Sequence, residues 1–277
     1  MEVTILGSAA AEGIPAIFCD CETCKKAWEL GGKDIRMRTA YKLNDRVRID
    51  FGPDQLAQEY RFKLHSERLR HLIITHPHED HLYAESLEYR HPGFSILNPD
   101  NQLKIYGNPA VLQLIRSKLV CGDKDRQLKL VQFGLFTPME IPEEDITIYP
   151  MAANHSLGGD ANIFVIRQGD KHLLIGNDTG FPNEETWKFL AALKRHLDIV
   201  ILDATGGPYI EYRSYHMSGH VPAEFRDRLV QLGLADGRTK AYVNHFSHNG
   251  RANHAELEAF YNPLGFQVGY DGCVITA

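Results

Sequence analysis

The chain has 277 residues, of which 43% are hydrophobic and 24% charged, an ordinary balance for a globular protein. Its formal net charge of −6 argues against a large nucleic-acid-binding surface, because such surfaces are usually basic. No uncharged apolar stretch reaches the roughly 18 residues that a membrane span requires. No basic segment followed by a long apolar one precedes the first apolar run, so we expect a cytoplasmic protein without a membrane partner.

Apolar strand-like runs alternate with amphipathic segments along the whole chain, a pattern that predicts an α/β fold. The predicted strands are Glu2–Leu6, Thr39–Leu43, Arg46–Ile49, His71–Ile74, Gln102–Tyr106, Ile146–Pro150, Asn162–Arg167, His172–Ile175, Ile199–Leu202, Ala241–Val243 and Gln267–Tyr270. The predicted helices are Glu22–Gly31, Asp54–Leu64, Pro109–Lys118, Asn183–Arg195, Pro222–Gly233 and Asn253–Tyr261. No linker-like or low-complexity segment interrupts them, so we interpret residues 1–277 as one domain.

A cluster of metal-ligand side chains follows the apolar run Leu72–Ile74 directly. His76 and His78 alternate, so in an extended turn their imidazoles point the same way. Asp80 and His81 are adjacent and diverge, so they can serve a second metal a few Å away. Imidazole nitrogen and carboxylate oxygen are ligands that Zn²⁺ prefers and Mn²⁺ accepts.

Further ligand types end later apolar runs. They are His155, Asp178 and His245, each of which comes after a strand-like segment. Asp50 ends the run Val47–Ile49 in the same way, and a carboxylate there can orient a metal-bound histidine through the second ring nitrogen. Polar ligands at the ends of neighbouring strands are expected to meet at one edge of a sheet.

Three of the five cysteines lie within six residues, as Cys19, Cys21 and Cys24. Thiolates at this spacing suit a structural zinc, which binds four ligands in a tetrahedron. The fourth ligand could be Cys121, Cys273 or a histidine. We favour His248, because it follows His245 by three residues and one tight loop could then serve both metal sites.

The segment from His76 to His81 resembles the H-x-H-x-D-H signature of the metallo-β-lactamase fold superfamily. The resemblance implies a four-layer αβ/βα sandwich and an active site with two divalent metals, Mn²⁺ or Zn²⁺. One metal would be held by His76, His78 and His155. The other would be held by Asp80, His81 and His245, and Asp178 would bridge the two.

The Cys triad combined with the C-terminal H-x-x-H makes the chain similar to a narrower family, the phosphoribosyl 1,2-cyclic phosphate phosphodiesterases of the carbon–phosphorus lyase pathway. This resemblance implies a metal-dependent phosphodiesterase. Its substrate would be a small cyclic or nucleotide-like phosphodiester, hydrolysed by a hydroxide that two metals activate. It also implies one structural Zn²⁺ and a homodimer.

Besides Asp80, the catalytic residue that we expect is a general acid for the leaving alkoxide, since a histidine pKa lies near working pH. His216 is the first choice, because its place before a capping serine and a helix resembles that of the family's proposed acid. His220 is the alternative.

Other functions share parts of the pattern. An oxidoreductase resembling the pyrroloquinoline quinone biosynthesis protein B also has an N-terminal Cys cluster and would use iron. A tRNA 3′-processing nuclease would want a basic arm that the chain does not show. A lactonase or thioesterase does not explain the Cys site, and a non-catalytic zinc module does not explain the second metal set. Aromatic residues between 83 and 144 are candidates for lining or covering the substrate pocket, namely Tyr83, Tyr89, His91, Phe94 and Tyr106.

Overall fold

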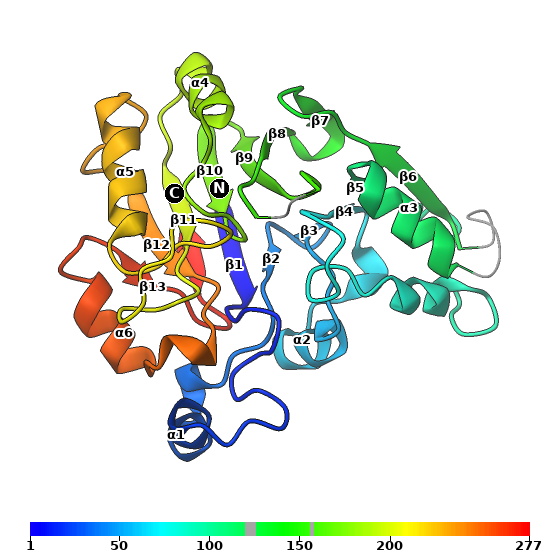
Figure 1. Cartoon of the computed structure of the whole chain (residues 1–277). Helices are drawn as coiled ribbons and strands as arrows, with labels where there is room; N and C mark the ends of the chain where they lie inside the picture. The colour runs from blue at the N-terminus through cyan, green and yellow to red at the C-terminus, as the bar shows by residue number, and fades with distance from the viewer. Residues whose placement is uncertain (120–125, 156–157) are drawn as a thin grey trace.

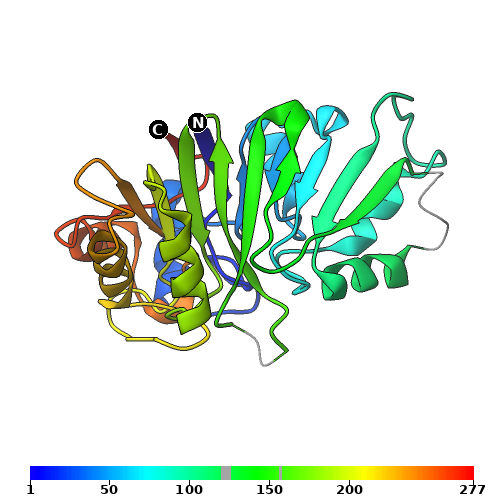
Figure 2. The same cartoon turned by 90° about the horizontal axis from the view of Figure 1, so that it is seen from above.

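Two mixed β-sheets pack face to face in the computed structural model, which describes residues 1–119, 126–155 and 158–277 (Figures 1 and 2). The first sheet has the strand order β14-β1-β2-β3-β4-β5-β6 and the second has the order β13-β12-β11-β10-β9-β8-β7. The first consists of β1 (Glu2–Gly7), β2 (Ala40–Lys42), β3 (Val47–Ile49), β4 (His71–Ile73), β5 (Leu103–Gly107), β6 (Leu128–Gln132) and β14 (Val274–Thr276). The second consists of β7 (Met139–Ile141), β8 (Ile146–Ala152), β9 (Asn162–Gln168), β10 (Lys171–Gly176), β11 (Ile199–Asp203), β12 (Lys240–Asn244) and β13 (Gln267–Val268).

The helices cover the outer faces of the two sheets, so the layers run helix, sheet, sheet, helix (Figure 2). The helices are α1 (Glu22–Leu30), α2 (Gln55–Phe62), α3 (Pro109–Lys118), α4 (Glu184–Leu193), α5 (Val221–Gln231) and α6 (His254–Tyr261). Helices α4, α5 and α6 pack on the second sheet, whereas α3 packs on the first. The predicted αβ/βα sandwich is therefore confirmed.

Alternating side chains divide the core into layers. In β11, Ile199 and Ile201 pack between the two sheets, whereas Val200 and Leu202 pack against the helices. Both faces of such a strand are buried, which explains why it is an uninterrupted apolar run in the sequence. Apolar burial at roughly 25 cal/mol per Å² is the main force holding the four layers together.

Every predicted strand and helix is present, with ends shifted by a few residues, but three strands were not predicted. The unpredicted strands are β6, β7 and β14. Strand β6 is a short edge strand that mixes lysine and glutamine with leucine and valine, so it lacks a clear apolar run. Strand β14 pairs antiparallel with β1, so the two ends of the described chain lie side by side.

The loops at one edge of the sandwich follow the carboxyl ends of parallel strands, since β3 and β4 are parallel and so are β10, β11 and β12. This edge of an open α/β sheet is where binding sites usually form. Gly52 is needed here, because a Cβ at this position would lie 2.0 Å from the carbonyl oxygen of Asp80. Across the described residues, no helix combines the length and apolar character required to cross a bilayer.

Candidate metal centre

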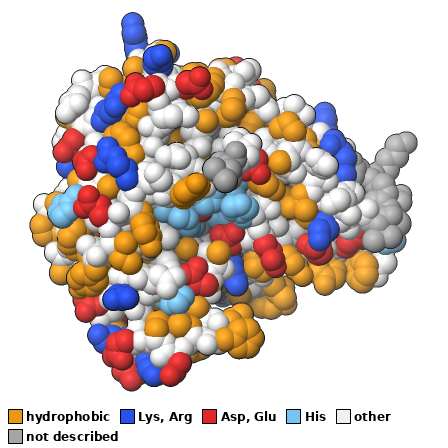
Figure 3. All heavy atoms as spheres, viewed as in Figure 1, with side chains coloured by type: hydrophobic (Ala, Val, Ile, Leu, Met, Phe, Trp, Pro, Cys, Tyr) orange, Lys and Arg blue, Asp and Glu red, His pale blue; other side chains and the backbone are white. Residues whose placement is uncertain are grey.

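Histidine side chains gather near the centre of the face shown in Figure 3. They come from the loops that follow β4, β8, β11 and β12. Asp50, Asp178 and His245 each come directly or shortly after a strand and adopt left-handed backbone angles, with φ of 66°, 50° and 67°. Such angles are uncommon for residues other than glycine and tend to persist at functional sites. They turn the backbone sharply at each of these three positions.

The first group of donors is His76, His78 and His155. The Nδ1 atom of His78 lies 3.0 Å from Nε2 of His76 and 3.2 Å from Nε2 of His155. The other nitrogen of His155 lies 3.0 Å from the carbonyl oxygen of Tyr215, which only accepts hydrogen bonds. Nδ1 of His155 therefore carries the proton, and its Nε2 presents a lone pair to the group. Three ring nitrogens thus converge on one point.

The second group is Asp80, His81, Asp178 and His245, all of them buried. Oδ2 of Asp178 lies 2.9 Å from Nε2 of His81 and 2.9 Å from Nε2 of His245. Oδ2 of Asp80 lies 3.2 Å from the same nitrogen of His81. The other oxygen of Asp178, Oδ1, is 3.6 Å from Nε2 of His155 in the first group. Asp178 thus faces both groups, as a bridging ligand must.

The donor set fits a divalent metal because its central atoms lack hydrogen-bond partners. Nε2 of His81, Nε2 of His245 and Oδ2 of Asp178 are all buried, and none of them makes a hydrogen bond to the described part of the chain. Nδ1 of His81 donates to Asp50 at 2.6 Å, and Nδ1 of His245 lies 2.8 Å from the hydroxyl of Thr205. With Nδ1 held in this way, each ring turns Nε2 toward the Asp178 carboxylate, and a metal cation in place of the ring protons would satisfy this cluster of nitrogen and oxygen donors.

The charges in this cluster depend on each other. Burial lowers the pKa of the His81 imidazole, but the carboxylates of Asp178, Asp80 and Asp50 outweigh burial and raise it well above its ordinary value. Burial raises the pKa of the Asp178 carboxyl, yet His245 and His81 hold it well below its ordinary value. A divalent cation would balance the same carboxylates in place of imidazole protons.

A supporting layer holds these donors, and sequence reasoning found only part of it. Asp50, which the sequence suggested, is 3% exposed and also accepts hydrogen bonds from the backbone and hydroxyl of Thr75. Asp203 and Thr205 were missed. Asp203 accepts from the backbone of Asp178 at 3.0 Å and from the Thr205 hydroxyl at 2.8 Å. The available signal was an aspartate at the end of an apolar run, the same pattern that identified Asp178.

His216 lies at the site, whereas His220 lies away from it. Nδ1 of His216 is 3.1 Å from Oδ2 of Asp203, and its ring stacks 5.5 Å from that of His245. Burial lowers the pKa of His216, but the Asp203 carboxylate outweighs it and raises the pKa to about 9. His220 is 62% exposed and packs against Phe260. The geometry therefore favours the first choice for a general acid over its alternative.

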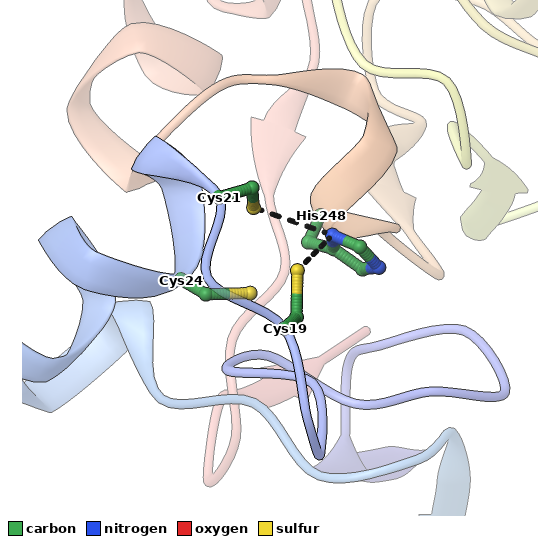
Figure 4. Close-up of side chains that lie close together, drawn as sticks. All are labelled: Cys19, Cys21, Cys24 and His248. Carbon is green, nitrogen blue, oxygen red and sulfur yellow. Dashed lines mark hydrogen bonds between the residues drawn. The ribbon is translucent and has the colours of Figure 1, made fainter.

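A separate set of donors, the Cys–His group, brings an N-terminal loop together with a loop near the C-terminus. Cys19, Cys21, Cys24 and His248 offer atoms that all lie within 4.8 Å of one another (Figure 4). Nδ1 of His248 is 3.4 Å from the sulfur of Cys19 and 3.4 Å from that of Cys21. Tetrahedral zinc, with Zn–S bonds of about 2.3 Å and Zn–N bonds of about 2.0 Å, requires donors at such separations.

The pKa values of the thiols in the Cys–His group also suit a metal. Burial would raise the pKa of the Cys21 thiol, but hydrogen bonds from the Cys24 backbone and His248 lower it to about 6. Burial raises the pKa of Cys24 to about 12, with neighbouring thiolates adding to the effect. A cation is therefore needed for all three sulfurs to be thiolates together. Of the other candidates for the fourth ligand, Cys273 is buried beside the backbone of Ile5, and Cys121 lies outside the described residues.

A cavity of about 560 Å³ opens onto both histidine groups. Its lining comprises Ala10, Ala11, Glu12, His78, Asp80, His155, Asp178, Thr205, Tyr212, Ser214, Tyr215, His216, His245, Ser247 and Asn249. None of the aromatic residues named between 83 and 144 is in this lining, so the expectation that they line the pocket is wrong. The alternative that they cover it stays a prediction. That region instead forms β5, α3, β6 and β7, and Tyr106 is buried against His71. The aromatic wall is made by Tyr212 and Tyr215, which sequence reasoning missed.

Comparisons with known proteins agree with this architecture. A crystal structure of a diphosphatase from the PhnP family superposes with a TM-score of 0.74 at 22% identity, covering 100% of this chain and 97% of the other. The Zn²⁺-bound PqqB of Methylobacterium extorquens gives a TM-score of 0.75 at 16% identity, covering 100% of both chains. The human short-form tRNase Z gives 0.63 at 17% identity, covering 100% of this chain and 99% of the other. At these identities the likeness establishes the fold.

Two matches rest on sequence. A curated protein of Porphyromonas gingivalis named octanoyltransferase is 24% identical over 285 residues, which cover 98% of this chain. The chain spans about half the length of that relative, 51%. Residues 45–246, which include both histidine groups, match the family described as the beta-lactamase superfamily domain. The chain therefore belongs to the beta-lactamase superfamily, as its H-x-H-x-D-H segment predicted.

Proposed function

We propose that this protein is a metal-dependent phosphodiesterase that hydrolyses a small cyclic or nucleotide-like phosphodiester. The observation that carries the proposal is the pair of donor groups that share Asp178, whose two oxygens face opposite groups at 2.9 Å and 3.6 Å. Two metals about 3.5–4 Å apart are the arrangement that clamps the attacking and leaving oxygens of an in-line displacement at phosphorus. A single-metal site would not require a bridging carboxylate.

The proposed ligands are those expected from the sequence. His76, His78 and His155 would hold one divalent metal. Asp80, His81 and His245 would hold the other, with Asp178 between them. When bound, the metals would supply Lewis acidity toward the phosphoryl oxygens and acidify a water molecule. Manganese and zinc both suit this mixture of imidazole and carboxylate.

The chain's own residues would complete the reaction. Hydrolysis forms a P–O bond to water and breaks the P–O bond to the alcohol, whose oxygen leaves as an alkoxide and needs a proton. Asp203 holds Nδ1 of His216, so Nε2 would carry that proton at the cavity wall. Bound cations would lower the pKa of His216 from about 9 toward neutrality by repulsion. Its proton could then be released within the working range of pH.

We propose a structural Zn²⁺ at Cys19, Cys21, Cys24 and His248, separate from the active site. These residues do not line the catalytic cavity, although the neighbours of His248 do. The zinc would join the N-terminal loop to the loop after β12. In this arrangement the zinc would take no part in the reaction and would stabilise the loops that form the cavity wall.

Elemental analysis of the purified protein, paired with hydrolysis of bis(p-nitrophenyl) phosphate before and after Mn²⁺ addition, tests the proposal. We expect about three metals per chain and diester hydrolysis that Mn²⁺ stimulates. The monoester p-nitrophenyl phosphate is the control and should react much more slowly. Iron at the histidine groups with no diester turnover would contradict the proposal and favour the oxidoreductase that resembles pyrroloquinoline quinone biosynthesis protein B.

A further inference from the structure

Glu12 lies where the catalytic cavity and the Cys–His group meet. It follows β1 in a loop whose Ala10 backbone N–H donates to the carbonyl oxygen of Phe246 at 2.9 Å. Its side chain lines the cavity, and one oxygen lies 3.5 Å from Nε2 of His248. Because Nδ1 of His248 faces the cysteine sulfurs, Glu12 contacts the opposite side of this ring.

The two carboxylate oxygens of Glu12 have different surroundings. The contacts with the described residues go to Oε1, which accepts from the hydroxyl of Ser247, lies 3.5 Å from Nδ2 of Asn249 and faces His248. Oε2 meets no donor in the part of the chain that the structure describes, and the side chain is 30% exposed. Glu12 is therefore held in place by one oxygen while the other is free to accept a hydrogen bond in the cavity. An acceptor held in advance loses little conformational entropy on binding.

The cavity offers little to a polyanion. Among the described residues that line it, none is lysine or arginine. The metals would take the phosphodiester itself, so any second phosphate on the substrate would have to lie elsewhere in the cavity. There it would meet the Glu12 carboxylate without a guanidinium or ammonium to bind it. The lining also has uncharged polar side chains that can bind neutral polar groups, among them Tyr212, Ser214 and Tyr215.

These observations identify Glu12 as a candidate determinant of substrate specificity. We propose that Glu12 selects phosphodiesters in which the ester group retained on phosphorus carries a free hydroxyl, by accepting its hydrogen bond on Oε2, and rejects those with a second phosphate in that place. The inference rests on the proposed phosphodiesterase function and defines the substrate class of the same site. A single residue thereby provides both an attractive and a repulsive element, which together produce discrimination.

The test uses three substrates that differ at one position. They are thymidine 5′-(p-nitrophenyl phosphate), its 3′-deoxy form and its 3′-phosphorylated form, assayed with the full-length Mn²⁺-loaded protein. In the native protein, kcat/KM should be about tenfold lower for the 3′-deoxy form than for the 3′-hydroxyl form, the loss expected for one charge-assisted hydrogen bond. It should be lower again for the 3′-phosphorylated form.

The variant Glu12→Gln removes the charge and keeps the shape. The penalty for the 3′-phosphate should shrink about tenfold, and the advantage of the hydroxyl should diminish, with the changes mainly in KM because the group lies away from phosphorus. A purely structural role through His248 would instead lower kcat equally for all three substrates and reduce the zinc content. Glu211→Gln is the matched control, since Glu211 is 60% exposed and outside the cavity, and it should keep the native preference.

The outcomes separate the two proposals. If the native protein hydrolyses neither the thymidine series nor bis(p-nitrophenyl) phosphate, the proposed function fails. If it hydrolyses bis(p-nitrophenyl) phosphate but does not prefer the 3′-hydroxyl substrate over the 3′-phosphate, the inference about Glu12 is overturned and the function stands. The same holds if Glu12→Gln keeps the native preference. The native preference is itself a test, so the inference stays falsifiable even if the variant loses zinc.

Discussion

Individual residues at this site are oriented by the atom that does not face the proposed metals. His81 is fixed by Asp50, His245 by Thr205 and His155 by a backbone carbonyl. Each contact places the ring proton on one nitrogen and leaves the other with a lone pair directed at the group. His216 is held in the same manner through Nδ1 by Asp203, and its side of the cavity is shared with His155 and His245.

The residue His216 supports a prediction that depends on the leaving group. An alkoxide leaving group needs a proton, whereas p-nitrophenolate leaves without one, so His216→Ala should lower kcat by about 10²–10⁴ for alkyl diesters and far less for p-nitrophenyl diesters. Steady-state kinetics with both substrate types and elemental analysis measure this. His220→Ala is the control and should behave like the native enzyme. Equal losses on both substrates, or full turnover with native metal content, would rule out the general acid.

The loop after β12 is the element that connects the two metal groups. It delivers His245 to the histidine groups, Ser247 and Asn249 to the cavity wall, and His248 to the cysteines. The loop that contains Glu12 pairs with it through Phe246, whose N–H donates to the carbonyl oxygen of Ser8 at 2.9 Å. Any displacement of the Cys–His group is therefore expected to reach the active site through a few residues.

The variant Cys21→Ser tests this connection. It should lose one zinc per chain and lower the midpoint of thermal unfolding by about 5–10 °C, because the site contributes to folding free energy. The active-site metals should remain while KM rises, since the cavity wall loses its support. Elemental analysis, calorimetry and diester kinetics measure these effects. Cys273→Ser should keep all its zinc; unchanged zinc in Cys21→Ser would refute the proposed structural site.

The whole molecule buries histidines outside the site as well. His71, His172 and His254 are 1%, 7% and 5% exposed. Burial lowers the pKa of all three, to about 4 for His71 and His254. Between that value and the ordinary value of about 6.5, the unfolded chain binds protons that the folded chain does not. Folding is therefore expected to weaken as pH falls through this interval.

We predict that the free energy of unfolding is independent of these groups above pH 6.5 and falls as pH drops toward 4. Each group contributes a slope of up to about 1.4 kcal/mol per pH unit. Urea unfolding at several pH values measures the free energy of unfolding of the native protein and of His71→Gln. Because acid weakens metal binding equally in both proteins, that effect cancels in the difference between them. The variant should show the shallower slope. Equal slopes would mean that His71 is not buried in its neutral form.

Much of the site was visible in the sequence, because each ligand is a polar residue after an apolar run and the runs become strands. The segment from His76 to His81 and the Cys triad each place several donors within a few residues, so local spacing alone indicated metal binding. Asp203 also ends an apolar run, but its role and that of Thr205 could not be assigned from spacing, since these side chains hold Asp178 and His245, which are 25 and 40 residues away in the chain. The same holds for Glu12, which is 235 residues from Ser247.

The sequence by itself determined the residue types, their order and the alternation of strands and helices, because period and composition are local properties. Only the tertiary structure decided which donors share a point and that His216 and not His220 lines the cavity. It also decided that the described residues between 83 and 144 supply β5 and β6 to the first sheet and β7 to the second, and none of their aromatic side chains to the cavity lining. Those outcomes depend on how two sheets pack and where their strands end. The packing energy comes from many weak contacts between segments that are distant in the chain, so it cannot be predicted from a local sequence pattern.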